Sequence, residues 1–203
     1  MYSVLAGILD DAVRDRLLAS NPARGVKLPR RSRRPNVYLS AEQLRRLAVE
    51  SGRYGSLVLL LGTVGLRWGE AAALRVSDVD FLRRRVVLHE NAVAVGARTH
   101  VGTLKSGRSR AVALPAFVVD ELAVTCVGKG RDELIWPAAD GGYLAPPTNK
   151  SWLSGAVQRC QKSDPKFPRI AAHALRHTAA SLAVSAGANV KVVQRMLGTP
   201  RRP

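Results

Sequence analysis

The spacing of apolar residues changes twice along this chain, and this change limits its possible folds more than any other feature. Up to about residue 74, apolar residues recur at helical intervals. They then alternate with a period of two, which predicts short strands at 85–88, 99–104 and 110–114. Helical spacing returns after Pro115, a residue that suits the start of a helix. The sequence therefore predicts a mainly α-helical, α+β fold with a small antiparallel sheet.

Capping residues and glycines mark where the helices begin and end. Ser40 and Gln43 have the spacing of a capping box, so we expect a folded unit to begin at residue 39. An apolar helix is predicted over 56–64, and Gly65 breaks it before a short helix over 68–74. Further helices are predicted over 115–127, 152–160, 173–186 and 190–197.

Two segments precede this unit. Residues 1–20 have helical spacing that Asn21 and Pro22 stop, and residues 22–38 are rich in proline and basic side chains. Such a linker is either solvated or lies along phosphates. In the second case its DNA-binding residues are Arg30, Arg31, Arg33 and Arg34. We therefore expect a helix at 1–21, a basic linker at 22–38 and a larger domain at 39–203.

The chain is strongly basic, with 32 Lys and Arg against 15 Asp and Glu and a formal net charge of +17. This charge favours a polyanionic partner. A hydrophobic content of 46% excludes a disordered basic tail, because such a chain buries enough surface to fold. No apolar run reaches the roughly 20 residues that span a bilayer, and the two cysteines lack the spacing of a disulfide framework or a zinc site. We expect a reducing compartment and no membrane association.

Arg67 is the first of three basic positions at predicted element boundaries. It follows Gly65 and has apolar residues on both sides, so its charge needs an anionic partner. That partner is either a ligand or a nearby carboxylate, Glu70 or Asp78. The spacing leaves both interpretations open.

His173 and Arg176 form the second position, on one face at the start of a predicted helix. A helix N-terminus, a guanidinium and an imidazole together suit a phosphate and the extra charge of its pentavalent transition state. The alternative is that the histidines are core residues, which fits His177 better than His173. Lys105 is the third position, at the tip of a hairpin predicted between strands 99–104 and 110–114. There it either enters a groove or is merely solvated.

Four short motifs occur in a fixed order, namely GLRWGE at 65–70, TLKSG at 103–107 with RAVAL at 110–114, HALRHT at 173–178 and VQRMLG at 193–198. In the same order, these motifs resemble the first arginine box, the lysine hairpin, the His-x-x-Arg box and the lead into the last box of the tyrosine recombinases, or phage integrases. The resemblance covers nearly the whole chain. The shared order argues against chance similarity.

The resemblance implies a site-specific DNA recombinase in which Arg67 and Arg176 grip the scissile phosphate. His173 would be the acid–base group, and Lys105 would protonate the leaving 5′ oxygen. In the family a tyrosine attacks the phosphate and forms a 3′-phosphotyrosyl link, so no metal ion or cofactor is required. The implied partners are double-stranded DNA at attachment-type sites, which Arg108 would also contact, and other recombinase protomers. A protein of this kind is expected in the cytoplasm, at the nucleoid.

The chain departs from the family pattern near its end. The family has a histidine directly after Gly198, where this chain has Thr199, and a nucleophilic tyrosine further on. The four tyrosines present occupy other segments, so none is a candidate nucleophile. We expect a C-terminally truncated catalytic domain that is inactive alone, preceded by the last helix of a truncated core-binding domain.

Three alternatives follow from this departure. The chain is a non-catalytic DNA-binding fragment that occupies recombination sites or interferes with an intact recombinase, or it accepts a tyrosine from a neighbouring protomer, or it binds RNA. A suicide substrate separates the first two, because only a supplied tyrosine traps a covalent adduct.

Overall fold

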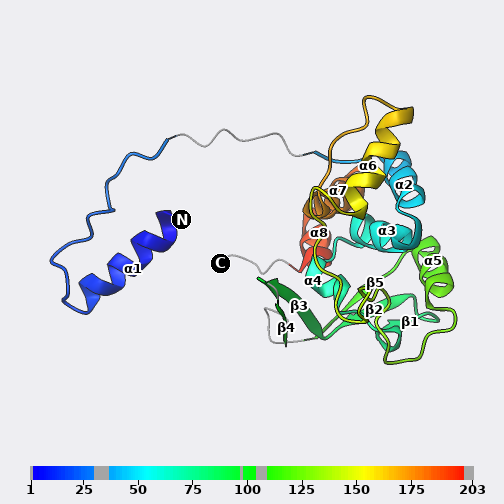
Figure 1. The fold of residues 1–203 in the computed structure, drawn as a ribbon, viewed down its shortest axis with the longest axis horizontal. Helices are drawn as coiled ribbons and strands as arrows, with labels where there is room; N and C mark the ends of the chain where they lie inside the picture. The colour runs from blue at the N-terminus through cyan, green and yellow to red at the C-terminus, as the bar shows by residue number, and fades with distance from the viewer. Residues whose placement is uncertain (1, 30–36, 97, 104–108, 199–203) are drawn as a thin grey trace. The chain divides into compact units, whose positions relative to one another are not determined.

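The computed structural model describes residues 2–29, 37–96, 98–103 and 109–198, and it divides the chain into two compact units (Figure 1). The first unit is Met1–Pro35 and the second is Asn36–Pro203. The candidate site residues that are described all belong to the second unit.

The described part of the first unit holds helix α1 (Tyr2–Arg14) and a segment that folds back along it. The Asn21 amide donates a hydrogen bond to the Ala6 carbonyl (2.9 Å), and the Tyr2 hydroxyl donates to the Ala23 carbonyl (2.6 Å). Because Asn21 bonds back to the helix, the chain must reverse before it. α1 is therefore shorter than the predicted helix over 1–20.

Helices α2 (Ala41–Glu50) and α3 (Gly55–Val64) begin the second unit and are joined by a 3₁₀ turn over Gly52–Tyr54. The predicted capping box is confirmed. The Ser40 hydroxyl accepts from the Gln43 N–H (3.1 Å), and the Gln43 side chain accepts from the Ser40 N–H (3.0 Å). This pair satisfies donors that the first turn of a helix leaves open.

α3 lies at the centre of the second unit, packed against α2, α5 (Ala116–Cys126) and α7 (Ala172–Ser185) (Figure 1). Its sequence explains this position, because a helix that is apolar on all sides must be buried. α6 (Trp152–Ser163) packs on α2, and α8 (Val190–Leu197) packs on α7. The fully buried side chains of the core include Leu44, Leu57, Leu60, Leu61, Leu122 and Leu175.

The strands lie between α4 (Trp68–Ala72) and α5 in the sequence. A small antiparallel sheet has the order β1 (Val79–Asp80), β2 (Arg85–Leu88) and β5 (Arg110–Ala113). A separate ribbon pairs β3 (Glu90–Val95) with β4 (Arg98–Thr103). The predicted α+β class, with many helices and small antiparallel sheets, is confirmed.

The predicted hairpin between strands 99–104 and 110–114 is wrong. β4 pairs with β3, where no strand is predicted, and β5 pairs with β2. The prediction missed β3 because asparagine and alanine are weak strand formers. Pairing with β4 and packing against α4 (Trp68–Ala72) stabilise this strand instead.

Candidate functional site

Arg67 occupies the N-cap position of α4, at the predicted break after α3. Gly65 ends α3 in the left-handed conformation, with a φ of 71°, and its N–H donates to the Leu61 carbonyl (3.2 Å). A Cβ at position 65 would lie 2.6 Å from Leu197 Cδ2, so a larger residue would be both strained and crowded. Glycine therefore lets the end of α8 approach the break that carries Arg67.

Glu70 is almost fully buried in α4, with 3% of its side chain exposed. Its Oε1 accepts from Arg67 Nη1 (2.9 Å). Its Oε2 accepts from the Arg67 backbone N–H (2.9 Å) and from Arg110 Nη2 (2.9 Å). Of the two carboxylates considered for Arg67, Glu70 is thus the one that pairs with it, and Arg110 joins the pair from β5.

Arg176 lies near the N-terminal end of α7, and its guanidinium joins two other segments. Nη1 donates to the Gly65 carbonyl, and Nη2 donates to the Leu197 carbonyl. Burial, together with the positive charges of Arg67 and Arg110, lowers the pKa of Arg176 to about 10, while Glu70 opposes this shift. Arg176 is therefore still charged at neutral pH.

The three arginines and Glu70 form one cluster, which we call the arginine cluster (Arg67, Glu70, Arg110 and Arg176). Three positive charges and one negative charge leave a formal charge of +2. A buried excess of positive charge is costly unless an anion compensates it. The arrangement therefore suits a phosphate group, which guanidinium groups bind by paired, charge-assisted hydrogen bonds.

His173 lies exposed on α7, three residues before Arg176. Its ring meets the ring of His177 edge to face, with 5.0 Å between the centroids. Partial desolvation of the ring, together with the positive charges of His177 and Arg176, lowers the pKa of His173 below its usual range. A neutral imidazole at pH 7 both donates and accepts a hydrogen bond, as an acid–base group must.

Gly69 brings the β3–β4 ribbon close to the arginine cluster. A Cβ at this position would collide with the Ala92 carbonyl oxygen and the Asn91 side-chain oxygen of β3. The ribbon can therefore pack on α4 only because residue 69 has no side chain. The same helix thus holds Glu70, carries Arg67 at its start and supports β3.

Several predicted site residues lie outside the described residues, namely Lys105, Arg108, Arg30, Arg31, Arg33 and Arg34. The structure places the other three predicted catalytic residues together, because Arg176 bonds to the carbonyl of Gly65, two residues before Arg67, and His173 lies three residues before Arg176 on α7. Among the described residues, no group of histidine, cysteine, aspartate and glutamate side chains is arranged to hold a metal ion. None of the helices in the described ranges has the length and apolar character needed to cross a bilayer.

Arg110 was not predicted as a site residue, although the sequence carries a signal for it. Side chains alternate along a strand, so Arg110 shares a face with Val112 and Leu114. Both of these residues are buried. A cation on the buried face of a strand needs a partner, and here that partner is Glu70.

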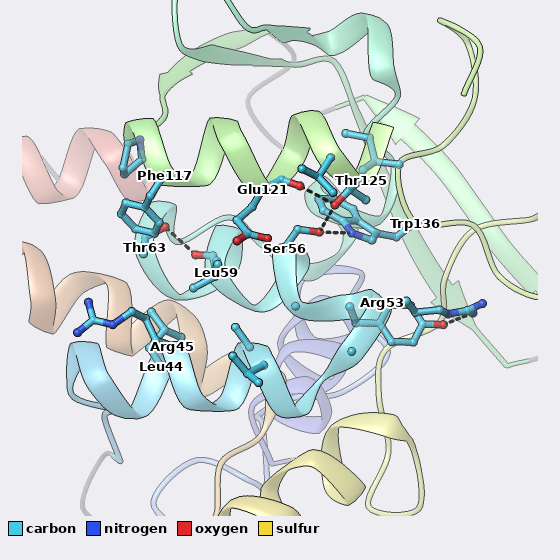
Figure 2. Close-up of a pocket in the computed structure, with 18 of the residues that line it drawn as sticks. Leu44, Arg45, Arg53, Ser56, Leu59, Thr63, Phe117, Glu121, Thr125 and Trp136 are labelled. Atoms are coloured by element: carbon cyan, nitrogen blue, oxygen red, sulfur yellow. Dashed lines mark hydrogen bonds between the residues drawn. The ribbon is translucent and has the colours of Figure 1, made fainter. Parts of the chain in front are cut away.

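A cavity of about 1290 Å³ lies elsewhere, among α2, α3 and α5 (Figure 2). Three of the polar side chains that line it are hydrogen-bonded to one another. The Ser56 hydroxyl accepts from Thr125 Oγ1 (2.8 Å) and from Trp136 Nε1 (3.0 Å). The residues that line this cavity include none of the arginine cluster, so it is separate from the candidate site.

Comparison with known proteins adds a family match. The model of the phage integrase family matches residues 38–199. The integrase of Mycobacterium phage L5 is 29% identical over 98% of this chain and 55% of its own length. A putative prophage phiRv2 integrase of Mycobacterium tuberculosis H37Rv is 29% identical over 97% of this chain and 53% of its own length. The chain thus spans about half the length of these relatives.

The fold also matches solved structures. The Tn1549 transposon integrase, solved in complex with a circular intermediate DNA, superposes with a TM-score of 0.83 at 18% identity. The match covers 98% of this chain and 70% of that one. At this identity the match concerns the fold alone, which this chain shares with that integrase.

Proposed function

Because this chain belongs to the phage integrase family of tyrosine recombinases, we propose that it binds duplex DNA and grips the scissile phosphate of a recombination site. The observation that carries this proposal is the arginine cluster, a partly buried group of three guanidiniums with one carboxylate. The solved Tn1549 integrase is bound to DNA, which supports a duplex as the partner. Attachment-type sites, further recombinase protomers and a location at the nucleoid of the cytoplasm belong to the same proposal.

In this proposal the cluster stabilises the transition state of phosphoryl transfer. Attack on a phosphodiester adds negative charge to the non-bridging oxygens, and Arg67 and Arg176 donate to them. His173 donates a hydrogen bond to the same phosphate and, as the acid–base group, accepts the proton that the attacking tyrosine hydroxyl loses. Lys105 protonates the 5′ oxygen as it leaves. The phosphotyrosyl bond keeps the energy of the broken bond, so the DNA can be rejoined without a cofactor.

We further propose that the nucleophile is none of the tyrosines in this chain. The Tyr54 ring stacks on Trp152, with 4.5 Å between the centroids. The Tyr143 hydroxyl accepts a hydrogen bond from Arg75 Nη2 (3.2 Å). Tyr2 lies in the first unit, and Tyr38 precedes α2. The tyrosine therefore comes from a segment or protomer other than these 203 residues.

Equilibrium binding of a labelled duplex tests the proposal. Affinity should fall by orders of magnitude between about 50 and 200 mM salt, because several phosphates are neutralised. Arg67→Ala and Arg176→Ala should each weaken binding about tenfold, since each removes a charged hydrogen-bond donor from the phosphate. The matched control is Arg131→Ala, which removes an exposed arginine outside the cluster.

The Arg131→Ala control distinguishes a defined phosphate site from a diffuse effect of charge. Equal effects of all three substitutions, measured at temperatures where each variant is folded, would show that charge acts diffusely and that the cluster is not the phosphate site. Binding that ignores salt would reject a phosphate partner altogether.

A further inference from the structure

We propose that Arg110 is a positioning residue of the phosphate site, which shares the charge of Glu70 and so leaves the charge of Arg67 available to DNA. This inference rests on the proposed function. It concerns a residue outside the predicted set of Arg67, Lys105, His173 and Arg176.

The Glu70 carboxylate has two arginine partners. Arg67 holds Oε1 through its guanidinium and Oε2 through its backbone N–H, and Arg110 Nη2 holds Oε2 from strand β5. The carboxylate is buried, so its charge is compensated mainly by these two arginines. If Arg110 were absent, the only guanidinium on this carboxylate among the described residues would be that of Arg67.

With Arg110 the arginine cluster has a formal charge of +2, and without it the formal charge is +1. Without Arg110, Arg67 alone neutralises the charge of Glu70. Only the charge of Arg176 is then left without a counter-charge in the cluster. Because electrostatic attraction is strong in a partly buried site, this loss weakens the hold on an anion.

Arg110 is the first residue of β5, and 21% of its side chain is exposed, against 38% for Arg67. Its Nε is buried and has no hydrogen-bond partner among the described residues. A Cβ at Gly198 would collide with its guanidinium, so the end of α8 packs directly on it. Arg110 is therefore more deeply buried than Arg67 and supports the arginine cluster from the interior of the protein.

These contacts join three segments at one side chain. Arg110 belongs to β5, bonds to α4 through Glu70 and touches the C-terminal glycine of α8. Arg176 bonds to the carbonyl of Leu197, the residue before that glycine. Arg176 thus bonds to the end of α8 and Arg110 lies close to the same end, which brings the two arginines together.

A charge-rescue experiment tests the inference with the full chain and a labelled duplex. Arg110→Gln lowers the formal charge of the cluster from +2 to +1, and we expect duplex binding to weaken about tenfold at fixed salt. Adding Glu70→Gln restores the formal charge to +2. The double variant should therefore bind within about threefold of the parent chain, a coupling that a double-mutant cycle measures.

The matched control is Arg85→Gln, on the neighbouring strand β2, where Arg85 forms an exposed ion pair with Asp80. It removes the same charge from the protein but not from the cluster, so it should change binding less than about threefold. A merely structural role of Arg110 predicts no rescue by Glu70→Gln, because that substitution removes another buried contact.

The outcomes separate this inference from the proposed function. A parent chain that does not bind duplex DNA rejects both. If the parent binds and Arg67→Ala weakens it, an Arg110→Gln effect equal to that of Arg85→Gln overturns the inference alone, and so does failure of the double variant to recover. Should Arg110→Gln not fold, Arg110→Lys keeps the charge and must bind within about threefold of the parent, or the inference is wrong.

Discussion

Gly69 connects two parts of the candidate site by having no side chain, because β3 packs against the position that a Cβ would occupy. We predict that Gly69→Ala lowers the free energy of unfolding by about 1–3 kcal/mol, as overpacking does in closely packed regions. Helix propensity alone would favour alanine by about 0.5–1 kcal/mol. A loss of stability would therefore show that the close contact with β3 outweighs helix propensity. Urea unfolding followed by circular dichroism measures the change in stability.

Gly155→Ala is the control, since Gly155 also lies inside a helix, α6, but its Cβ would meet only Arg159 Nη1, at 3.4 Å. This substitution should be neutral or stabilising. A Gly69→Ala variant that is as stable as the parent would show that β3 does not depend on the close approach.

His173 gives the second unit a defined response to acid. Partial desolvation and two neighbouring positive charges lower the pKa of His173, so below about pH 6.5 the unfolded chain binds more protons than the folded one. The stability linked to this group is fully present above that pH and is lost as the pH falls towards the lower folded pKa. We predict that His173→Gln reduces the fall of the melting temperature between about pH 7.5 and pH 5.

The measurement is the melting temperature of the parent chain and of the His173→Gln variant across this pH range. The effect is small, because His173 is an exposed residue. The two curves should differ least at the alkaline end. If the melting temperatures of the two proteins fell equally down to pH 5, the lowered pKa of His173 would not be the cause of the response to acid.

Helix α2 begins with a capping box. Ser40 and Gln43 satisfy each other's backbone N–H groups, and the helix then presents Leu44 and Leu47 to α3. We predict that Ser40→Ala lowers the free energy of unfolding by about 1 kcal/mol. Chemical denaturation measures this change. Ser185→Ala, at the exposed C-terminal end of α7, serves as the control and should lie within about 0.5 kcal/mol of the parent.

Elements with local signals were predictable. The capping box before α2, the glycine break after α3 and the glycine that ends α8 each depend on residues within a few positions of one another. The adjacency of Arg67 and Glu70 was also open to prediction, because a helix brings residues three apart together. The motif order then supplied the family.

Elements with distant partners were not predictable in the same way. β3 has weak strand propensity, and its pairing with β4 and its contact with Gly69 arise only in the folded unit. Arg110 and Glu70 are separated by 40 positions, so no short-range spacing connects them. Whole-unit packing decides both features, which explains why the strand pairing was predicted wrongly and Arg110 was overlooked.

The second unit as a whole builds the arginine cluster from segments that are distant in the sequence. Gly65 and Arg67 follow α3, Arg110 begins β5, Arg176 comes from α7, and Leu197 ends α8. Because Arg110 bonds to Glu70 of α4 and Arg176 bonds to the carbonyls of Gly65 and Leu197, the cluster forms only when the unit is folded. Loss of the cluster and loss of the fold must therefore be measured separately in every variant.

We predict that the 203-residue chain alone forms no SDS-resistant adduct with a nicked suicide duplex, because an activated phosphate needs a positioned nucleophile to form a protein link. Adding a family-type C-terminal helix with a tyrosine at the family spacing, together with Thr199→His, should produce the adduct on a cognate site. Arg176→Ala should abolish this gain, and Lys105→Ala should reduce it, since the first removes transition-state stabilisation and the second removes the leaving-group acid. Denaturing gels of the labelled duplex measure each case. An adduct from the unextended chain would show that one of its own tyrosines attacks, whereas extended-chain activity that is indifferent to Arg176 would move the phosphate site away from the arginine cluster.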